Sequence, residues 1–174
     1  MCGIVSYLGK SDSVPIILKG LERLEYRGYD SAGLALIDGD NLSCIKQSGK
    51  VSELNSKIEK ISMKGSYGIA HTRWATHGPP NDTNAHPHLD QTGKIALVHN
   101  GIIENYSSIK LTLEGRGLKF TSDTDTEVLV QLISELYYNN DKKVSFENAV
   151  KAALQEVVGL SLIHISEPTR PERI

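Results

Sequence analysis

The chain begins Met1-Cys2-Gly3-Ile4-Val5, and the cysteine at the second position is its most informative residue. An initiator methionine is normally removed when a small residue follows it, and Cys2 would then become the N-terminal residue. Its thiol would lie beside a free α-amine, whose reference pKa of about 7.7–8.0 suits a base at neutral pH. One residue would thus supply both nucleophile and base. The alternative is that this stretch simply starts a buried strand, and by itself it leaves both interpretations open.

Three later segments decide between these alternatives. They read Arg23-Leu-Glu-Tyr-Arg-Gly-Tyr-Asp-Ser-Ala-Gly33, His71-Thr-Arg-Trp-Ala-Thr-His-Gly78 and Val98-His-Asn-Gly-Ile-Ile-Glu-Asn105. With Cys2-Gly3-Ile4-Val5 before them, and in this order, they resemble the class II glutamine amidotransferases, which are N-terminal-nucleophile hydrolases. Within that family, the motif sequences are most similar to those of the glutaminase domains of glucosamine-6-phosphate synthases, the isomerising glutamine:fructose-6-phosphate transaminases. The resemblance extends from Cys2 to about Gly159.

The resemblance implies an α+β fold, the four-layer αββα sandwich of N-terminal-nucleophile hydrolases, incomplete at its C-terminal side. The sequence pattern agrees, because strands cluster early and helices lie between and after them. We expect strands at 2–8, 32–38, 42–47, 67–74 and 94–99, and helices at 13–24, 51–61, 105–115, 124–138 and 145–158. Residues 54, 58 and 61 should face inward from the second helix. Thr124-Asp-Thr-Glu127 predicts a capping box, and the long loop 78–93 is expected to be functional.

Hydrolysis of a glutamine side-chain amide needs a nucleophile, a proton shuttle and donors for the oxyanion. Cys2 would supply the thiolate, and its amine would act first as base and then as acid toward the leaving ammonia. The resemblance assigns the oxyanion donors to the side chain of Asn100 and the backbone N–H of Gly101, at the end of a strand. Without the other motifs, Asn100-Gly101 would be interpreted as an ordinary turn.

Free glutamine carries a carboxylate and an ammonium group, so its recognition requires a cation and an anion. The planar guanidinium of Arg73 matches a carboxylate, and the resemblance implies that it binds the substrate's α-carboxylate. Thr76 and His77 would line the same site. Asp125 would receive the α-ammonium, although a place in the first turn of a helix also suits it to capping and helix-dipole interactions.

Two further residues are weaker candidates. Arg27 lies in the Tyr26-Arg-Gly-Tyr29 loop, which in the family packs near the nucleophile, where a positive charge would favour a thiolate. A surface salt bridge is the alternative for Arg27. The counterpart of Trp74, the single tryptophan, belongs to the ammonia-transfer apparatus in the family, and a place in the core is its alternative.

We expect neither a metal nor a cofactor. Four histidines invite a zinc interpretation, namely His71, His77, His86 and His88. Their spacing matches no structural or catalytic zinc pattern, and no acidic or cysteine ligand recurs with them.

The 174 residues carry a formal net charge of −2, which gives no electrostatic reason to expect a nucleic-acid partner. No apolar run approaches the length of about 18 residues that spans a membrane, and no secretory signal begins the chain. Two cysteines, Cys2 and Cys44, make no disulfide framework, so we expect a cytoplasmic protein whose thiol stays reduced. The partners implied by the resemblance are L-glutamine and, only through a missing isomerase domain, fructose-6-phosphate, in a full-length homo-oligomer.

The stretch Leu160-Ser-Leu-Ile-His-Ile-Ser-Glu-Pro-Thr-Arg170 matches the conceptual translation of a sequencing-library adapter. We therefore expect residues 1–159 to be a truncated glutaminase domain and residues 160–174 to be a non-native tail. The alternative is a genuine strand followed by a polar end. Loss of central strands would expose unpaired edges and core surface, so we expect weak or absent hydrolysis from this fragment.

Three other functions compete. The chain could be the glutaminase domain of another class II amidotransferase, or a glutamine-binding module without catalysis, although a binder needs neither a nucleophile nor oxyanion donors. It could also be a conventional Cys–His hydrolase that uses His71 or His77 as its base.

Overall fold

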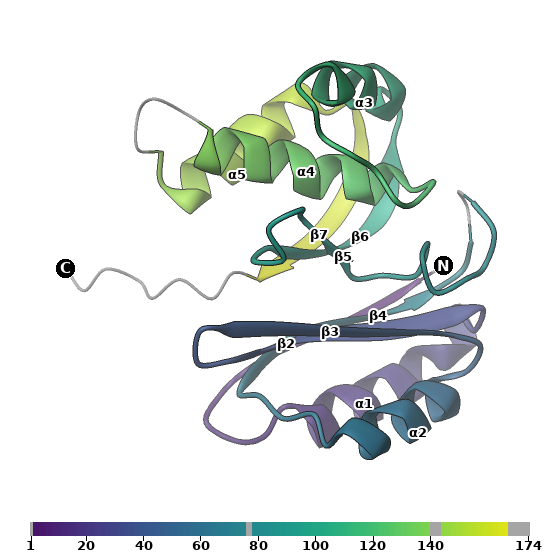
Figure 1. The fold of residues 1–174 in the computed structure, drawn as a ribbon. Coiled ribbons are helices and arrows are strands. Elements are labelled where there is room, and N and C mark those ends of the chain that lie inside the picture. Colours follow the sequence, from purple (N-terminus) through teal and green to yellow (C-terminus); the bar gives the residue numbers. More distant parts are fainter. Residues whose placement is uncertain (1, 76–77, 140–143, 167–174) are drawn as a thin grey trace.

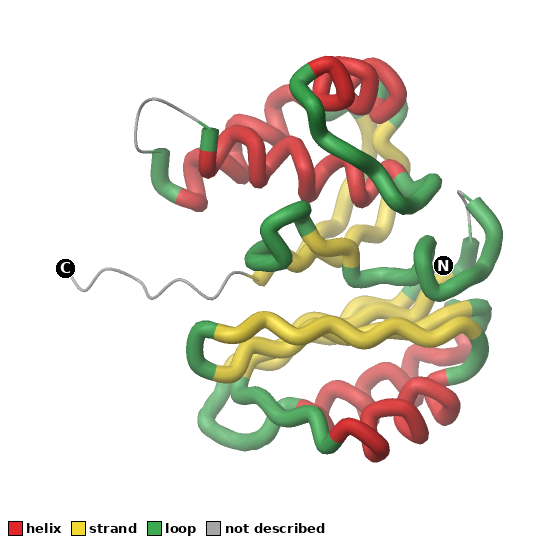
Figure 2. Tube along the Cα trace, in the orientation of Figure 1, coloured by secondary structure: helices red, strands yellow, loops and turns green. Residues whose placement is uncertain are grey.

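The fold is a four-layer sandwich of helices, sheet, sheet and helices (Figure 1). The computed structural model describes residues 2–75, 78–139 and 144–166. Figure 2 shows the strands of both sheets lying together in the middle of the molecule, with helices on the two outer sides. The expected α+β class and the αββα order of layers are confirmed.

The first sheet is antiparallel throughout. Its four strands lie in the spatial order β1 (Gly3–Leu8), β4 (Tyr67–Arg73), β2 (Ser31–Asp38) and β3 (Asn41–Ser48). The register pairs Gly3 with Thr72, so the residue before Gly3 reaches the end of β4. This register places Cys2 beside the Arg73-Trp74 segment.

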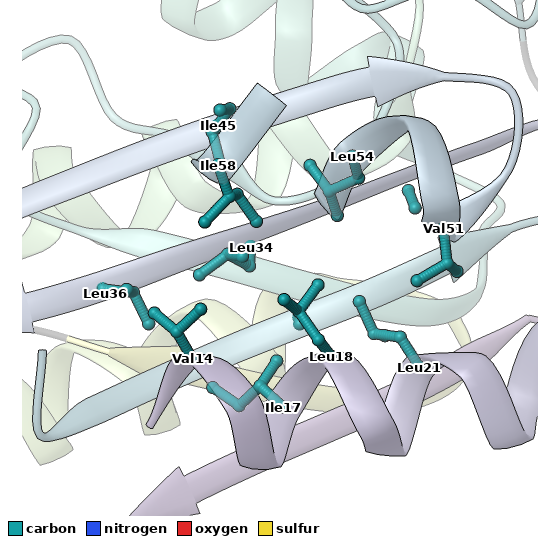
Figure 3. Packing of buried hydrophobic residues seen from close by; sticks show 12 residues of the cluster. Val14, Ile17, Leu18, Leu21, Leu34, Leu36, Ile45, Val51, Leu54 and Ile58 are labelled. Atoms are coloured by element: carbon teal, nitrogen blue, oxygen red, sulfur yellow. The ribbon is translucent and has the colours of Figure 1, made fainter. Parts of the chain in front are cut away.

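Two helices cover the outer face of this sheet, α1 (Val14–Leu24) and α2 (Val51–Ile61). Their apolar residues recur at helical spacing and point at the leucines of β2, as Figure 3 shows for Ile17, Leu34 and Leu54. The prediction that Ile61 faces inward is wrong, because this side chain is 58% exposed. Helix α2 ends at Ile61, and the left-handed backbone of Ser62 then turns the chain away.

The second sheet contains β5 (His88–Leu89), β6 (Ala96–Ile103) and β7 (Gly159–Ser166), in that order. Two predictions are corrected here. Strand β6 continues to Ile103 instead of ending at His99, so Asn100 and Gly101 lie within a strand that pairs with β7 along its length. The loop 78–93 contains the short strand β5, which no alternation in its sequence indicates.

Strand β7 lies beyond the expected domain boundary at residue 159. Ile163 and Ile165 pack against the helices of the second core. An alternating apolar stretch of any origin can complete a sheet, so the assignment of 160–174 to a non-native tail stays a prediction.

Three helices cover the second sheet, α3 (Tyr106–Gly115), α4 (Asp125–Tyr138) and α5 (Phe146–Glu156). The predicted capping box at the start of α4 is half correct. Thr124 Oγ1 accepts a hydrogen bond from Glu127 N at 3.3 Å, as predicted. The carboxylate of Glu127 instead accepts from Thr121 N and Ser122 N, at 2.9 and 2.6 Å. It therefore fixes the turn that leads into α4.

The two sheets meet face to face across a small apolar layer that includes Ile69 of β4 and Val98 of β6. Because side chains alternate along a strand, the residues two positions further on share these faces. They are His71 on β4 and Asn100 on β6. The apolar layer thus gives way to polar residues at the end where Cys2 lies.

Candidate active site

A cavity of about 500 Å³ lies at the polar end of the interface between the sheets. Seven of the nine residues selected from the sequence line it: Cys2, Arg27, Arg73, Trp74, Asn100, Gly101 and Asp125. The other two, Thr76 and His77, lie outside the described residues. The cavity falls within the size range of small-molecule sites. These seven residues come from five separate segments, so the fold brings them together.

The thiol of Cys2 is half-buried and lies against the backbone of Trp74. Trp74 N donates to Cys2 Sγ at 3.2 Å, and the carbonyl oxygen of Trp74 lies 3.6 Å from the same sulfur. The next amide, Ala75 N, donates to the carboxylate of Asp30. A backbone N–H directed at sulfur stabilises negative charge there, so this turn is suited to hold a nucleophilic thiolate.

The side chain of Asn100, on β6 of the second sheet, contacts both Cys2 and His71 of the first sheet. Its Nδ2 donates to the carbonyl oxygen of Cys2 at 3.2 Å, and its Oδ1 lies 2.8 Å from His71 Nε2. Gly101 follows with φ of +156° and is exposed to the cavity. This φ is one that residues with a Cβ rarely adopt. The Asn100 carboxamide and the Gly101 backbone of β6 therefore line the same cavity as Cys2.

Arg73 is the main positive charge of the cavity wall and is only 3% exposed. Burial lowers its pKa, and the nearby charges of Asp30, Cys2 and Asp125 oppose that effect. A guanidinium nevertheless stays protonated in proteins. Gly28 makes room for this segment, because a Cβ there would lie 2.6 Å from the carbonyl carbon of Arg73.

Asp125 is the buried acid of the opposite wall. It is the first residue of α4, and its Oδ2 accepts from Ile103 N of β6 at 2.9 Å. Thr124, not Asp125, supplies the cap of the helix. The carboxylate is thus held by a neighbouring strand and faces the same cavity as Arg73, so both charges that a free amino acid requires are present.

Arg27 and Trp74 lie at the entrance. The Arg27 guanidinium carbon lies 6.0 Å from the centre of the Tyr26 ring, and Arg27 also lines the cavity. The Trp74 indole is 50% exposed and meets Tyr29 edge-on, with ring centres 5.4 Å apart. Trp74 is therefore a wall residue and not part of the core.

Sequence reasoning missed the role of the buried histidines behind the cavity. The rings of His71 and His86 stack with centres 4.3 Å apart, and His88 meets His86 edge-on at 4.8 Å. His99 Nδ1 lies 3.1 Å from Thr126 Oγ1. Strand alternation was the available signal, since His71 shares a face with Arg73 two residues later.

Burial keeps the imidazoles of His71, His86 and His88 neutral. It lowers the pKa of His71 to about 4, against the opposing effect of the hydrogen bond with Asn100. Burial also lowers the pKa values of His86 and His88 well below 6.5, and neighbouring positive charges add to the effect. Within the described residues, no three His, Cys, Asp or Glu side chains form a group that could hold a metal ion. The described helices also include none long and apolar enough to cross a membrane.

Residues 38–146, more than half of the chain, match the family model of the glutamine amidotransferase domain. The chain belongs to this family. The matched segment of this glutamine amidotransferase domain includes Arg73, Asn100, Gly101 and Asp125, and it begins after Cys2.

Relatives of the glutamine amidotransferase family extend the likeness beyond the matched segment to the whole of this chain. A glutamine–fructose-6-phosphate aminotransferase (isomerizing) from Bacteroides thetaiotaomicron is 54% identical over 175 residues, covering 100% of this chain and 28% of its own length. The protein of the same name from Thermus thermophilus is 52% identical over 152 residues, covering 87% of this chain and 25% of its own. The chain thus spans about a quarter of the length of these relatives.

Solved structures share the fold. The glutamine phosphoribosylpyrophosphate amidotransferase from B. subtilis, complexed with ADP and GMP, is 30% identical with a TM-score of 0.79, over 97% of this chain and 35% of that chain. The allosteric regulatory enzyme of purine biosynthesis is 31% identical with a TM-score of 0.81, over 97% and 35%. The expected fold of N-terminal-nucleophile amidotransferases is therefore confirmed for this domain.

Proposed function

We propose that this chain is a glutaminase domain that hydrolyses the side-chain amide of L-glutamine to glutamate and ammonia at Cys2. One observation carries the proposal. The backbone N–H of Trp74 lies 3.2 Å from the Cys2 thiol. The Asn100 amide lies 3.2 Å from the Cys2 carbonyl oxygen, and Cys2 and Asn100 line the same cavity. A nucleophile and a carboxamide donor thus face one cavity, as amide hydrolysis requires.

The reaction would proceed through a thioester. With Met1 removed, the α-amine of Cys2 takes the thiol proton, and the thiolate attacks the side-chain carbonyl carbon of glutamine. The oxyanion forms between Asn100 Nδ2 and Gly101 N–H. The carbon–nitrogen bond then breaks, and the ammonium of Cys2 returns its proton to the leaving ammonia. Water hydrolyses the γ-glutamyl thioester and releases glutamate with the free thiol.

Substrate recognition would use the two charged walls of the cavity. The guanidinium of Arg73 would bind the α-carboxylate and Asp125 the α-ammonium, with Thr76 and His77 completing the site. Arg27 would add positive potential near the thiolate. Both Arg73 and Asp125 are already buried, so the protein has met most of the desolvation cost before substrate binds.

The ammonia released at Cys2 would be used by another domain of a longer protein. The relatives' printed names support fructose-6-phosphate as the acceptor, giving glucosamine-6-phosphate through an isomerase domain that lies beyond this part of the protein. Trp74, exposed at the entrance, would then contribute to ammonia transfer. We expect the full-length enzyme to be a homo-oligomer in the cytoplasm, where Cys2 stays reduced.

Intact-mass spectrometry with 6-diazo-5-oxo-L-norleucine, a diazoketone analogue of glutamine, tests the proposal. We expect loss of Met1 and a single adduct on Cys2 that excess glutamine prevents, with Cys44 unlabelled. Loss of Met1 without an adduct would show that the site does not assemble in this chain. An adduct on chains that keep Met1 would eliminate the α-amine as the base.

A Cys–His mechanism is the main rival, and His71 is poorly suited to it. Its Nε2 is engaged with Asn100 at 2.8 Å, and its pKa of about 4 makes it a weak base toward a thiol. Adding one residue before Cys2 separates the two mechanisms. The extension should abolish hydrolysis if the α-amine is the base, whereas a Cys–His enzyme would keep it.

A further inference from the structure

The side chain of Asn100 can face the nucleophile in two orientations with opposite consequences. With Nδ2 toward the cavity, it donates a hydrogen bond to a developing oxyanion. With Oδ1 in that place, it would repel the same charge. The hydrolysis proposed above therefore depends on whatever fixes this orientation.

Two neighbours determine the orientation of the Asn100 carboxamide. The carbonyl oxygen of Cys2, 3.2 Å away, can only accept, so the nitrogen of the amide must lie on that side. Oδ1 then faces His71 Nε2 at 2.8 Å, and His71 must donate to it. One Nδ2 proton is taken by Cys2, which leaves the second proton for the oxyanion.

His71 is enclosed by its surroundings. It lies on β4, in the sheet opposite to that of Asn100, and is 1% exposed. Its ring stacks on His86 at an angle of 23°. Burial lowers its pKa to about 4, so at neutral pH it has a single N–H, and the Asn100 oxygen requires that proton on Nε2.

We propose that His71 is a positioning residue for hydrolysis at Cys2, whose Nε2–H holds Asn100 Oδ1 so that Asn100 Nδ2 faces the oxyanion. This inference rests on the proposed function. His71 itself neither attacks nor transfers a proton; it acts through Asn100.

Two substitutions of matched size test the donor. His71→Gln can place an amide N–H where Nε2 lies, whereas His71→Leu fills the space without a donor. We expect kcat for ammonia release to fall about tenfold to a hundredfold in His71→Leu, less than the 10²–10³-fold loss typical of removing an oxyanion donor. The KM for glutamine should stay unchanged, and His71→Gln should restore most of kcat.

A double-mutant cycle separates positioning from general damage. Asn100→Ala removes the group that His71 orients, so adding His71→Leu to it should cause no further loss of kcat. Multiplied losses in the double variant, or a rise in KM together with a lower melting temperature, would show a merely structural role. If Asn100→Ala leaves ammonia release unchanged, the proposed function fails instead.

The third measurement needs no turnover. In ¹⁵N-histidine-labelled protein at pH 7, the nitrogen shifts of His71 report which ring nitrogen carries the proton. We expect the Nε2–H tautomer in the unsubstituted chain and a loss of that preference in Asn100→Ala. An Nδ1–H tautomer in the unsubstituted chain would overturn the inference even in a preparation with no measurable activity.

Discussion

The two sides of the cavity differ in their exposure to water. Its rim consists of Cys2, Arg27, Trp74, Gly101 and Ile102, all exposed or half-buried, with Trp74 and Ile102 50% and 49% exposed. Behind it lies a histidine layer, His71, His86, His88 and His99, in which no side chain exceeds 6% exposure. Reacting groups therefore lie on the open side, and the groups that orient them lie on the dry side.

This difference in exposure lets substrate reach the reacting groups while buried side chains hold those groups in position. A rim residue can change with little effect on folding, because it makes few buried contacts. The layer connects both sheets and α4 through His71 with Asn100, His88 with Thr124, and His99 with Thr126. Substitutions on the two sides should therefore differ in whether activity or stability responds.

The largest expected effect is at the rim. Cys2→Ser should reduce ammonia release on the order of 10⁴-fold or more, as loss of a nucleophile does in other hydrolases, without changing the melting temperature. Cys44→Ala is the matched control, since burial raises the pKa of Cys44 to about 11 and keeps it unreactive. Equal losses in both variants would contradict the assignment of the nucleophile.

The histidine layer should make the fold sensitive to acid. The folded-state pKa values of His71, His86 and His88 lie below the unfolded value of 6.5. The unfolded chain therefore binds more protons, and the free energy of unfolding falls as the pH drops below about 6.5. For His71 alone, the lowering to about 4 corresponds to roughly 3 kcal/mol. Urea unfolding at several pH values between 7 and 4.5 measures this pH dependence of the free energy of unfolding.

His71→Gln supplies the control for this pH dependence, because it removes the titrating ring but keeps a donor for Asn100. The loss of unfolding free energy should be shallower in that variant. A free energy that is constant from pH 7 to pH 5 in the unsubstituted chain would show that the layer is not dry. Hydrogen bonds that outweigh its burial lower the pKa of Asp90 from 3.8. The stabilisation from this carboxylate is lost only as the pH falls below about 3.8, so Asp90 does not affect the slope between pH 7 and pH 5.

Much of the fold follows from local patterns in the sequence. Helical spacing predicted α1 and α2, because each helix buries one face against the neighbouring sheet. The errors have two causes, pairing with a distant strand and a backbone turn that the sequence pattern does not indicate. Asn100 and Gly101 lie inside β6 because β7, far along the chain, pairs with them, and Ile61 lies outside because the chain turns at Ser62.

The candidate site was predictable only in part. Motif resemblance selected Cys2, Arg73, Asn100 and Asp125, whose side chains now line one cavity. It did not indicate His71 as the partner of Asn100, because that contact joins two sheets whose relative placement no local pattern encodes. Side-chain alternation limits the candidate partners of Asn100 to one face of each strand. The packing of the two sheets then decides which of these residues contacts Asn100.

Arg73→Lys tests a residue that lies between the rim and the histidine layer, on the same face of β4 as His71. Lysine keeps the charge but loses the planar pair of donors. Loss of a hydrogen bond to a charged group costs about 1.5–3 kcal/mol, so kcat/KM should fall about tenfold to a hundredfold, chiefly through KM. Arg23→Lys, on the exposed surface of α1, is the matched control. An unchanged KM would show that the α-carboxylate binds elsewhere.

Trp74→Leu should have the smallest effect on hydrolysis. Trp74 serves the nucleophile through its backbone N–H, which leucine retains, so the 3.2 Å contact with Cys2 Sγ should survive. The variant loses the edge-on pair with Tyr29, worth about 0.5–1.5 kcal/mol, and its melting temperature should fall accordingly. Ammonia release and thermal unfolding, measured together, separate these contributions. If hydrolysis instead collapses as in Cys2→Ser while the melting temperature is unchanged, the indole itself contacts the substrate, and the rim then takes part in positioning as well as access.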